Sequence, residues 1–130
     1  MKMRDSVVCI IRNDKGEILL QKKTLDYARA PGKWSLFGGA AESDNFEKEM
    51  NRELKEEIGI NMKLKFNFDF FSKEGKLYVF SSNLNDISKL SIGEGAGIAF
   101  FGEEELKDIK LLPECEKAIK MFLKKRERHN

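Results

Sequence analysis

Residues 38–60 read GGAAESDNFEKEMNRELKEEIGI, and this stretch decides how the chain is expected to fold. Apolar side chains recur in it at every fourth position, which is typical of the buried stripe of an amphipathic helix. These residues are Phe46, Met50, Leu54 and Ile58. Gly59 follows at once, and glycine commonly ends a helix because it adopts a left-handed conformation without strain. The pattern therefore predicts a helix that packs on a core through one stripe.

Three glutamates of this helix are predicted to share one arc. Glu53, Glu56 and Glu57 are spaced i, i+3 and i+4, which places them on one face of an α-helix. At about 100° per residue, Glu57 projects into the apolar stripe, Glu53 lies just beside it and Glu56 lies further round. Such close negative charges repel one another, so the cluster predicts a hard divalent cation with oxygen ligands, such as Mg²⁺. The alternative, a solvated acidic face, would lie opposite the stripe.

The same segment resembles the Nudix box, G-x5-E-x7-R-E-U-x-E-E-x-G-U, in which U is a bulky aliphatic residue. Eight of the nine specified positions match without a gap, namely Gly38, Arg52, Glu53, Leu54, Glu56, Glu57, Gly59 and Ile60. Asp44 departs from the pattern, because it stands where the box has Glu. The shorter side chain changes an outer metal contact or makes a better helix cap, with Glu47 completing a variant capping box. The chain is therefore similar to MutT-like members of the Nudix hydrolase family.

This resemblance implies a hydrolase that cleaves a phosphoanhydride bond in a nucleoside diphosphate linked to another group, X. The cofactor is expected to be Mg²⁺, with Mn²⁺ as the alternative. In the family, the glutamates that match Glu53, Glu56 and Glu57 bind metal, and a backbone carbonyl at the position of Gly38 often contributes. Arg52 is expected to orient a glutamate through an ion pair, and a bidentate contact would hold Glu53 in one rotamer.

There are two candidates for the general base, because family members differ in which glutamate they use. Glu53 belongs to the box, whereas Glu94 lies in a glycine-rich loop at residues 92–95. A carboxylate on such a loop could reach the metal site, and the alternative is an exposed acidic loop residue. The sequence therefore predicts Glu53, Arg52 and Glu94 as catalytic candidates.

In this family, residues outside the box determine which group X the enzyme accepts. Trp34 could stack on a base, Lys22, Lys23 or Arg29 could contact phosphates, and core or surface roles are the alternative for each. A nucleoside triphosphate, including an oxidised one, or a nucleotide sugar is the expected class. Tyr78 stands where dinucleoside polyphosphate hydrolases carry a tyrosine, so that activity is an alternative. A non-catalytic module that senses a nucleotide is another, although the intact glutamates argue against it.

The flanking segments predict an α/β fold. Two hairpins are expected at residues 7–23 and 62–84, a short strand at 33–37 that ends where Gly38-Gly39 turns the chain, a further short strand within 91–102, and a helix that Pro113 opens. Cys9 is expected in a core strand and Cys115 in the last helix. This order predicts a mixed sheet between helices, and it resembles the α/β/α sandwich of the Nudix fold.

Length and composition predict one domain over residues 1–130. The chain is 41% hydrophobic and 35% charged, and its formal net charge of +2 gives no electrostatic argument for nucleic acid or a membrane as partner. The basic run KKRER near the C-terminus is interpreted as a solvated helix end. A cytoplasmic location is expected, the partner is a small nucleotide, and whether the protein forms a homodimer is left open.

Overall fold

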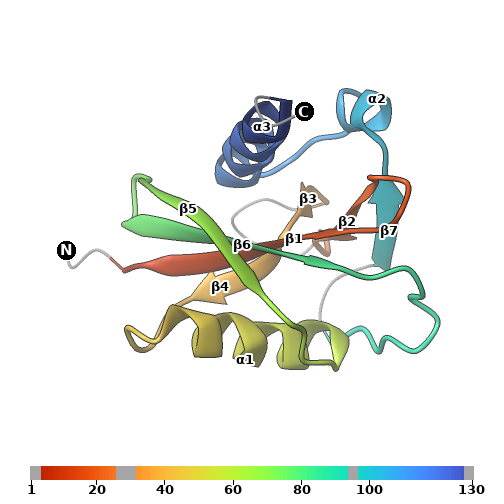
Figure 1. Cartoon of the computed structure of the whole chain (residues 1–130). Coiled ribbons are helices and arrows are strands. Elements are labelled where there is room, and N and C mark those ends of the chain that lie inside the picture. The colour runs from red at the N-terminus through yellow and green to blue at the C-terminus, as the bar shows by residue number, and fades with distance from the viewer. Residues whose placement is uncertain (1–3, 26–31, 94–96, 128–130) are drawn as a thin grey trace.

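A mixed sheet with a long helix on each face forms the molecule (Figure 1). The structure is a computed structural model that describes residues 4–25, 32–93 and 97–127. In chain order the elements are β1 (Ser6–Arg12), β2 (Ile18–Lys22), β3 (Trp34–Ser35), β4 (Phe37–Ala40), α1 (Phe46–Ile58), β5 (Lys65–Phe71), β6 (Lys76–Asn83), β7 (Gly97–Phe101), α2 (Glu103–Leu106) and α3 (Pro113–Glu127). The predicted α/β class, with a mixed sheet between helices, is confirmed.

The sheet is centred on β1 and runs in the order β3-β2-β1-β6-β5. β4 pairs with the first half of β1, and β7 pairs with β2. β1 and β6 are parallel, whereas the other pairs of strands are antiparallel. Both predicted hairpins are confirmed as the pairs β1–β2 and β5–β6. The short helix α2 was not predicted.

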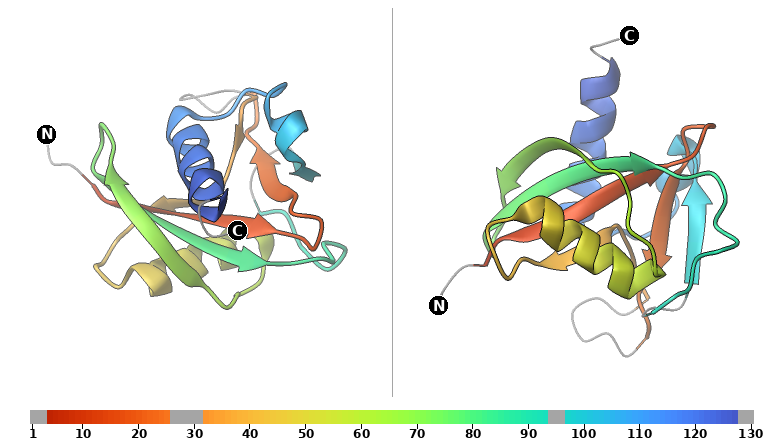
Figure 2. Two further views of the ribbon diagram at one scale, coloured as in Figure 1. Left: turned by 45° about the horizontal axis from the view of Figure 1, so that its top comes forward. Right: turned by 60° about the horizontal axis from the view of Figure 1, so that its bottom comes forward.

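Each face of the sheet has its own hydrophobic core, because successive side chains of a strand point to opposite faces. Val7, Cys9 and Ile11 pack with α1, whereas Val8 and Ile10 pack with α3. Two views confirm that α1 and α3 cover opposite faces (Figure 2). Among the described residues, no helix is both long enough and apolar enough to cross a membrane.

Helix α1 begins one residue later than the sequence predicts. Asn45, and not Asp44, is the N-cap, because its side-chain oxygen accepts a hydrogen bond from the Lys48 N–H at 3.3 Å. The predicted capping box of Asp44 with Glu47 is therefore wrong, and Asp44 lies exposed in the preceding loop. At the other end, Gly59 adopts the predicted left-handed conformation with φ of 79°.

The Gly38-Gly39 pair lies inside a strand and does not turn the chain as predicted. β4 continues through both glycines to Ala40 and pairs with the start of β1. A side chain at Gly38 would collide with the backbone carbonyl of Val7, so glycine permits the close approach of two strands. This approach brings β4 beneath the carboxylates of α1.

Candidate metal and catalytic site

The three glutamates of the box are buried to the graded extent that the helical projection predicts. Glu57 is 6% exposed, whereas the side chains of Glu53 and Glu56 are 13% and 58% exposed. Met50, Leu54 and Ile58 of the stripe are fully buried and hold this face of α1 on the sheet. The same packing that buries the stripe therefore carries Glu57 into the protein and leaves Glu56 at the surface.

Two groups from the sheet hold the buried Glu57 carboxylate. Gln21 Nε2 donates a hydrogen bond to Oε1 at 2.6 Å, and the backbone N–H of Gly38 donates to Oε2 at 2.9 Å. Burial raises the pKa of Glu57 to about 7, and the neighbouring charge of Glu53 adds to the rise, while Gln21, Lys23 and Gly38 oppose it. This carboxylate is therefore fixed in place but short of positive charge.

Gln21 is a site residue that the sequence reasoning missed. It is 2% exposed and lies on β2 among apolar neighbours. Its second contact runs from Nε2 to the carbonyl oxygen of Leu36 at 3.5 Å. The available signal was a polar residue within an apolar strand, since such a side chain needs a buried partner.

Glu53 faces the second glycine of β4. A Cβ atom added to Gly39 would lie 2.6 Å from Glu53 Oε1, closer than atoms can approach without movement. Glycine at this position therefore leaves the space that the Glu53 carboxylate occupies. Glu53 and Glu57 accordingly lie over adjacent residues of one strand.

Arg52 binds several carboxylates at once. Its Nη2 lies 3.1 Å from Glu53 Oε1 and 3.2 Å from Glu49 Oε1, and its Nη1 lies 3.0 Å from Glu56 Oε1. Nη2 also donates to the carbonyl oxygen of Ala40 at 3.3 Å. Partial burial disfavours the charged guanidinium, but the hydrogen bonds to Glu49 and Glu56 outweigh it and raise the pKa of Arg52. The expected ion pair with Glu53 is present, through one nitrogen and not as a bidentate contact.

Glu49 is the second site residue that the sequence reasoning missed. It is 5% exposed and accepts hydrogen bonds from the Glu42 N–H at 2.7 Å and the Ser43 hydroxyl at 3.2 Å. The Glu42 N–H is the largest reason why the pKa of Glu49 is lowered. Glu49 thus ties the loop between β4 and α1 to Arg52. Its position three residues before Arg52 was the signal that could have identified it.

The donor set fits a divalent cation in chemical type. Carboxylate oxygens are the ligands that hard cations prefer, and Glu53 and Glu57 lie close enough for the charge of Glu53 to raise the pKa of Glu57. Within the part of the chain that the structure describes, no three His, Cys, Asp or Glu side chains converge on one point. Arg52 binds Glu53 and Glu56 on one side, while Gln21 and Gly38 bind Glu57 on the other.

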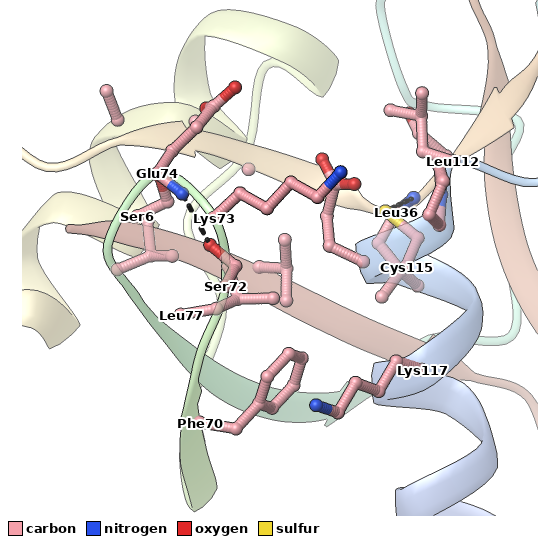
Figure 3. A pocket seen from close by; sticks show the side chains of 18 of the residues that line it. Ser6, Leu36, Phe70, Ser72, Lys73, Glu74, Leu77, Leu112, Cys115 and Lys117 are labelled. Atoms are coloured by element: carbon pink, nitrogen blue, oxygen red, sulfur yellow. Dashed lines mark hydrogen bonds between the residues drawn. The ribbon is translucent and has the colours of Figure 1, made fainter. Parts of the chain in front are cut away.

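A cavity of about 700 Å³ borders β4. Gly38, Gly39 and Ala40 form part of its wall, so the strand that meets the carboxylates also borders the cavity. Figure 3 shows its apolar wall and the side chains of Phe70 and Lys117, which lie next to each other, with Lys117 Nζ 4.6 Å from the ring centroid. The lining cations are Lys23, Lys33, Lys73 and Lys117, and the lining acids are Glu74 and Glu114.

The structure does not bring most of the predicted substrate-binding residues to this cavity. Lys22 and Trp34 pair with each other across β2 and β3, and Trp34 packs edge-on against Phe101 with ring centroids 4.8 Å apart. Tyr78 stacks on Phe46 at 3.7 Å on the α1 side of the sheet. None of Lys22, Trp34 and Tyr78 lines the cavity, whereas Lys23 does.

Arg29 and Glu94, two further predicted residues, lie outside the described residues. The residue that precedes Glu94 is fixed, since the Gly93 N–H donates to the Glu57 carbonyl oxygen at 2.9 Å. The glycine-rich loop therefore starts at the C-terminal end of α1.

The fold and the site match one known family. A model of the NUDIX domain matches residues 2–122, and the chain therefore belongs to the Nudix family. The chain is 37% identical over 54 residues to the nucleoside triphosphatase NudI of Klebsiella pneumoniae, an alignment that covers 42% of this chain and 39% of that protein. It is 42% identical over 60 residues to NudI of Escherichia coli, covering 45% and 42%. The matched region thus spans about two fifths of these curated relatives.

Solved structures agree on the fold. The MutT protein from Methanosarcina mazei superposes with a TM-score of 0.72 and 25% identity, over 99% of this chain and 96% of that one. The NUDIX domain of NrtR from Shewanella oneidensis, crystallised with ADP ribose, has a TM-score of 0.76 at 14% identity, over 100% and 90%. At that identity the second similarity concerns the fold alone.

Proposed function

We propose that this protein is a metal-dependent hydrolase that cleaves a phosphoanhydride bond of a nucleoside triphosphate. The observation that carries the proposal is the position of Glu53 and Glu57 over Gly38 and Gly39, next to a cavity with four lysines in its wall. Carboxylates suit a divalent cation, and lysines suit phosphates. One strand brings the two together.

Nudix hydrolases generally use divalent metal cations, and Mg²⁺, with Mn²⁺ as the alternative, is the cation we propose. Glu53, Glu56, Glu57 and the carbonyl of Gly38 are the proposed ligands. When bound, such a cation neutralises the charge that develops on the phosphate oxygens and lowers the pKa of the attacking water.

The chain itself positions these groups. Gln21 and the Gly38 N–H hold the Glu57 carboxylate, so that it does not reorient when substrate arrives. Arg52 holds Glu53 and is itself fixed by Glu49 and the Ala40 carbonyl. Either Glu53 or Glu94 takes a proton from the water as general base, and Arg52 acts by orienting Glu53.

The name of the NudI relatives supports a nucleoside triphosphate as the substrate class. The cavity offers Phe70, Leu77 and Leu112 as an apolar wall for a base, and its lysines for the phosphates. The Ser35 hydroxyl also lines it and is buried with no hydrogen-bond partner among the described residues. Oxidised triphosphates and nucleotide sugars fit the same description, and a cytoplasmic location stays a prediction from the sequence.

The test is a phosphate-release and product analysis with Mg²⁺ and with chelator. The panel contains the common nucleoside triphosphates, oxidised triphosphates, nucleotide sugars and dinucleoside polyphosphates. We expect Mg²⁺-dependent turnover of a triphosphate and its loss in Glu53→Gln. Glu94→Gln separates the two candidate bases, because it slows the chemical step only if Glu94 takes the proton.

Two results would contradict the proposal. Turnover of a nucleotide sugar or a dinucleoside polyphosphate, but of no triphosphate, would replace the substrate class. Tight nucleotide binding without turnover of any compound in folded, metal-loaded protein would favour the non-catalytic sensor.

A further inference from the structure

A second cavity, of about 800 Å³, lies at the other end of β1. It is bounded by the ends of β1 and β6, the start of β5 and the last turns of α3. Among the described residues, it shares no lining residue with the cavity beside Gly38. Arg12 lines it and lies four positions beyond Val8 along β1, which corresponds to about 13 Å of extended strand. The two cavities are therefore separate sites.

The charged residues that line this second cavity are all cationic. They come from β1, from the segment leading into β5 and from α3, and they are Arg12, Lys63, Lys65, Lys125 and Arg126. No carboxylate of the described residues lines it. The protein as a whole has nearly balanced charge, with 24 Lys and Arg against 22 Asp and Glu. A cavity lined by five cations and no described acid is therefore a local excess of positive charge.

Arg12 packs on an aromatic ring and forms no ion pair with a described carboxylate. Its guanidinium carbon lies 4.8 Å from the centre of the Phe122 ring, and its Nε is buried with no hydrogen-bond partner among the described residues. Burial lowers the pKa of Arg12, and the nearby Arg126 lowers it further. A buried N–H that makes no hydrogen bond is costly, and neither an acid nor a hydrogen-bond acceptor of the described residues compensates this group.

Lys125 is oriented by similar contacts. Its Nζ donates to the Asn67 carbonyl oxygen at 3.1 Å and lies 5.6 Å from the centre of the Phe68 ring. Ser81 and Asn67, which bond to each other at 2.8 Å, add neutral polar groups to the wall. The site thus combines fixed cations with groups that can donate hydrogen bonds.

We propose that this cavity binds a small anion with more than one phosphate charge, such as an oligophosphate or a phosphorylated small molecule. Arginine presents several donors in a plane and matches phosphate oxygens in pairs. A volume of about 800 Å³ is in the range of small-molecule sites, and the cations surround one cavity instead of following an extended path. The shape therefore favours a small ligand over a nucleic acid strand. The proposal does not depend on the hydrolase activity.

The probe is inorganic tripolyphosphate, titrated calorimetrically into the whole protein in EDTA, so that no metal bridges it to the glutamates. We expect binding that weakens with added NaCl and whose Kd rises at least tenfold in Arg12→Gln. Lys125→Gln with Arg126→Gln forms a second test on exposed positions, where folding should be retained. Amide chemical-shift changes on titration should be largest around Arg12 and Asn67.

The matched control is Lys107→Gln with Lys120→Gln, which removes the same charge at exposed ion pairs outside the cavity. Absence of tripolyphosphate binding, equal weakening in the control, or shift changes confined to Gly38 and Gly39 would overturn the proposal. Tighter binding of a single-stranded oligonucleotide than of tripolyphosphate would also overturn it and assign the surface to nucleic acid.

Discussion

Charged side chains near the start of β1 meet opposite charges, whereas those near its end meet mainly like charges. At one end Arg52 contacts Glu49, Glu53 and Glu56 within 3.2 Å. At the other end Arg12 lies on an aromatic ring and near Arg126. In the first region each charged side chain holds its neighbours in position, so we expect one substitution to displace several side chains. In the second, we expect a substitution to change mainly the local charge.

Replacing Glu57 by Gln should have the largest effect. The change removes one negative charge and little volume, so the fold should persist while the proposed ligand set is broken. We expect kcat to fall at least about a hundredfold. The check is steady-state kinetics across Mg²⁺ concentrations, with circular dichroism to confirm folding. Full activity in a folded Glu57→Gln protein would reject the assignment of this residue as a metal ligand.

Gln21→Met tests whether the network around the α1 glutamates extends to a residue that lies outside the proposed substrate cavity. Without the Gln21 amide, Glu57 keeps only the Gly38 N–H of its two described hydrogen bonds. We expect a loss of about 10- to 100-fold in activity, together with a higher Mg²⁺ concentration for half-maximal rate. The stabilisation of the folded protein by Mg²⁺ should fall in parallel. Ser35→Ala is the control for Mg²⁺ dependence only, because Ser35 pairs with Gln21 across the strands and its hydroxyl has no described partner. An equal shift in Mg²⁺ dependence in Ser35→Ala would remove the special role of Gln21.

Glu49→Gln should show that the loop before α1 depends on this network. The substitution weakens the contacts of Glu49 to Arg52 and to the Glu42 N–H, and the second of these holds the loop between β4 and α1. We expect faster amide exchange in this loop and a loss of activity of about tenfold. Asp44→Ala, at an exposed position, should change neither. A larger effect of Asp44→Ala than of Glu49→Gln would restore the importance of the box position that departs from the family pattern.

The stability of the metal-free protein should depend on pH through Glu57. Its pKa is about 7 in the folded protein against an ordinary value of 4.5, so the folded state binds this proton more tightly. Its contribution to stability is therefore complete below about pH 4.5 and is lost as the pH rises through about 7. We expect the Tm of the wild type, measured in chelator, to fall relative to that of Glu57→Gln as the pH rises over this interval. A constant difference would show that the carboxylate does not titrate there.

Arg126→Gln should have the smallest effect. It should stabilise the protein slightly, whereas the substitutions around Arg52 and the glutamates cause losses. It removes a like charge near Arg12 and should raise the free energy of unfolding by about 0.3 kcal/mol at low salt. Urea unfolding at low salt and in concentrated NaCl measures this gain, which screening should abolish. A loss of stability would mean that Arg126 makes a favourable contact that outweighs the repulsion, and the contrast between the two regions would weaken.

The sequence predicted what local periodicity determines. The stripe of α1 and the graded burial of its glutamates follow from helical geometry, and both hairpins follow from apolar runs separated by turn residues. Asp44 and Asn45 are both good capping residues, so the pattern could not choose between them. The choice depends on which side chain reaches the Lys48 N–H.

The sequence could not predict contacts between distant segments. Gln21 and Glu57 are 36 positions apart, and their hydrogen bond depends on how α1 packs against the sheet. The cations of the second cavity come from β1, from around the start of β5 and from α3, which are far apart in the sequence. The basic run KKRER, taken alone, therefore indicates only a solvated helix end. Lys125 and Arg126 are exposed as expected, but the cations that join them come from elsewhere in the chain.

The parallel pairing of β1 with β6 has a consequence for the order of folding. The hydrogen bond from the Lys76 N–H to Asp5 at the start of this pair closes a segment of 71 positions, which contains β2, β4 and α1. Closing a long segment costs chain entropy before its contacts form, so such pairing is slow compared with a hairpin or a helix. The glutamate-bearing helix can therefore form early, but β1 and β6, whose opposite ends border the two cavities, come together only when this distant pairing occurs.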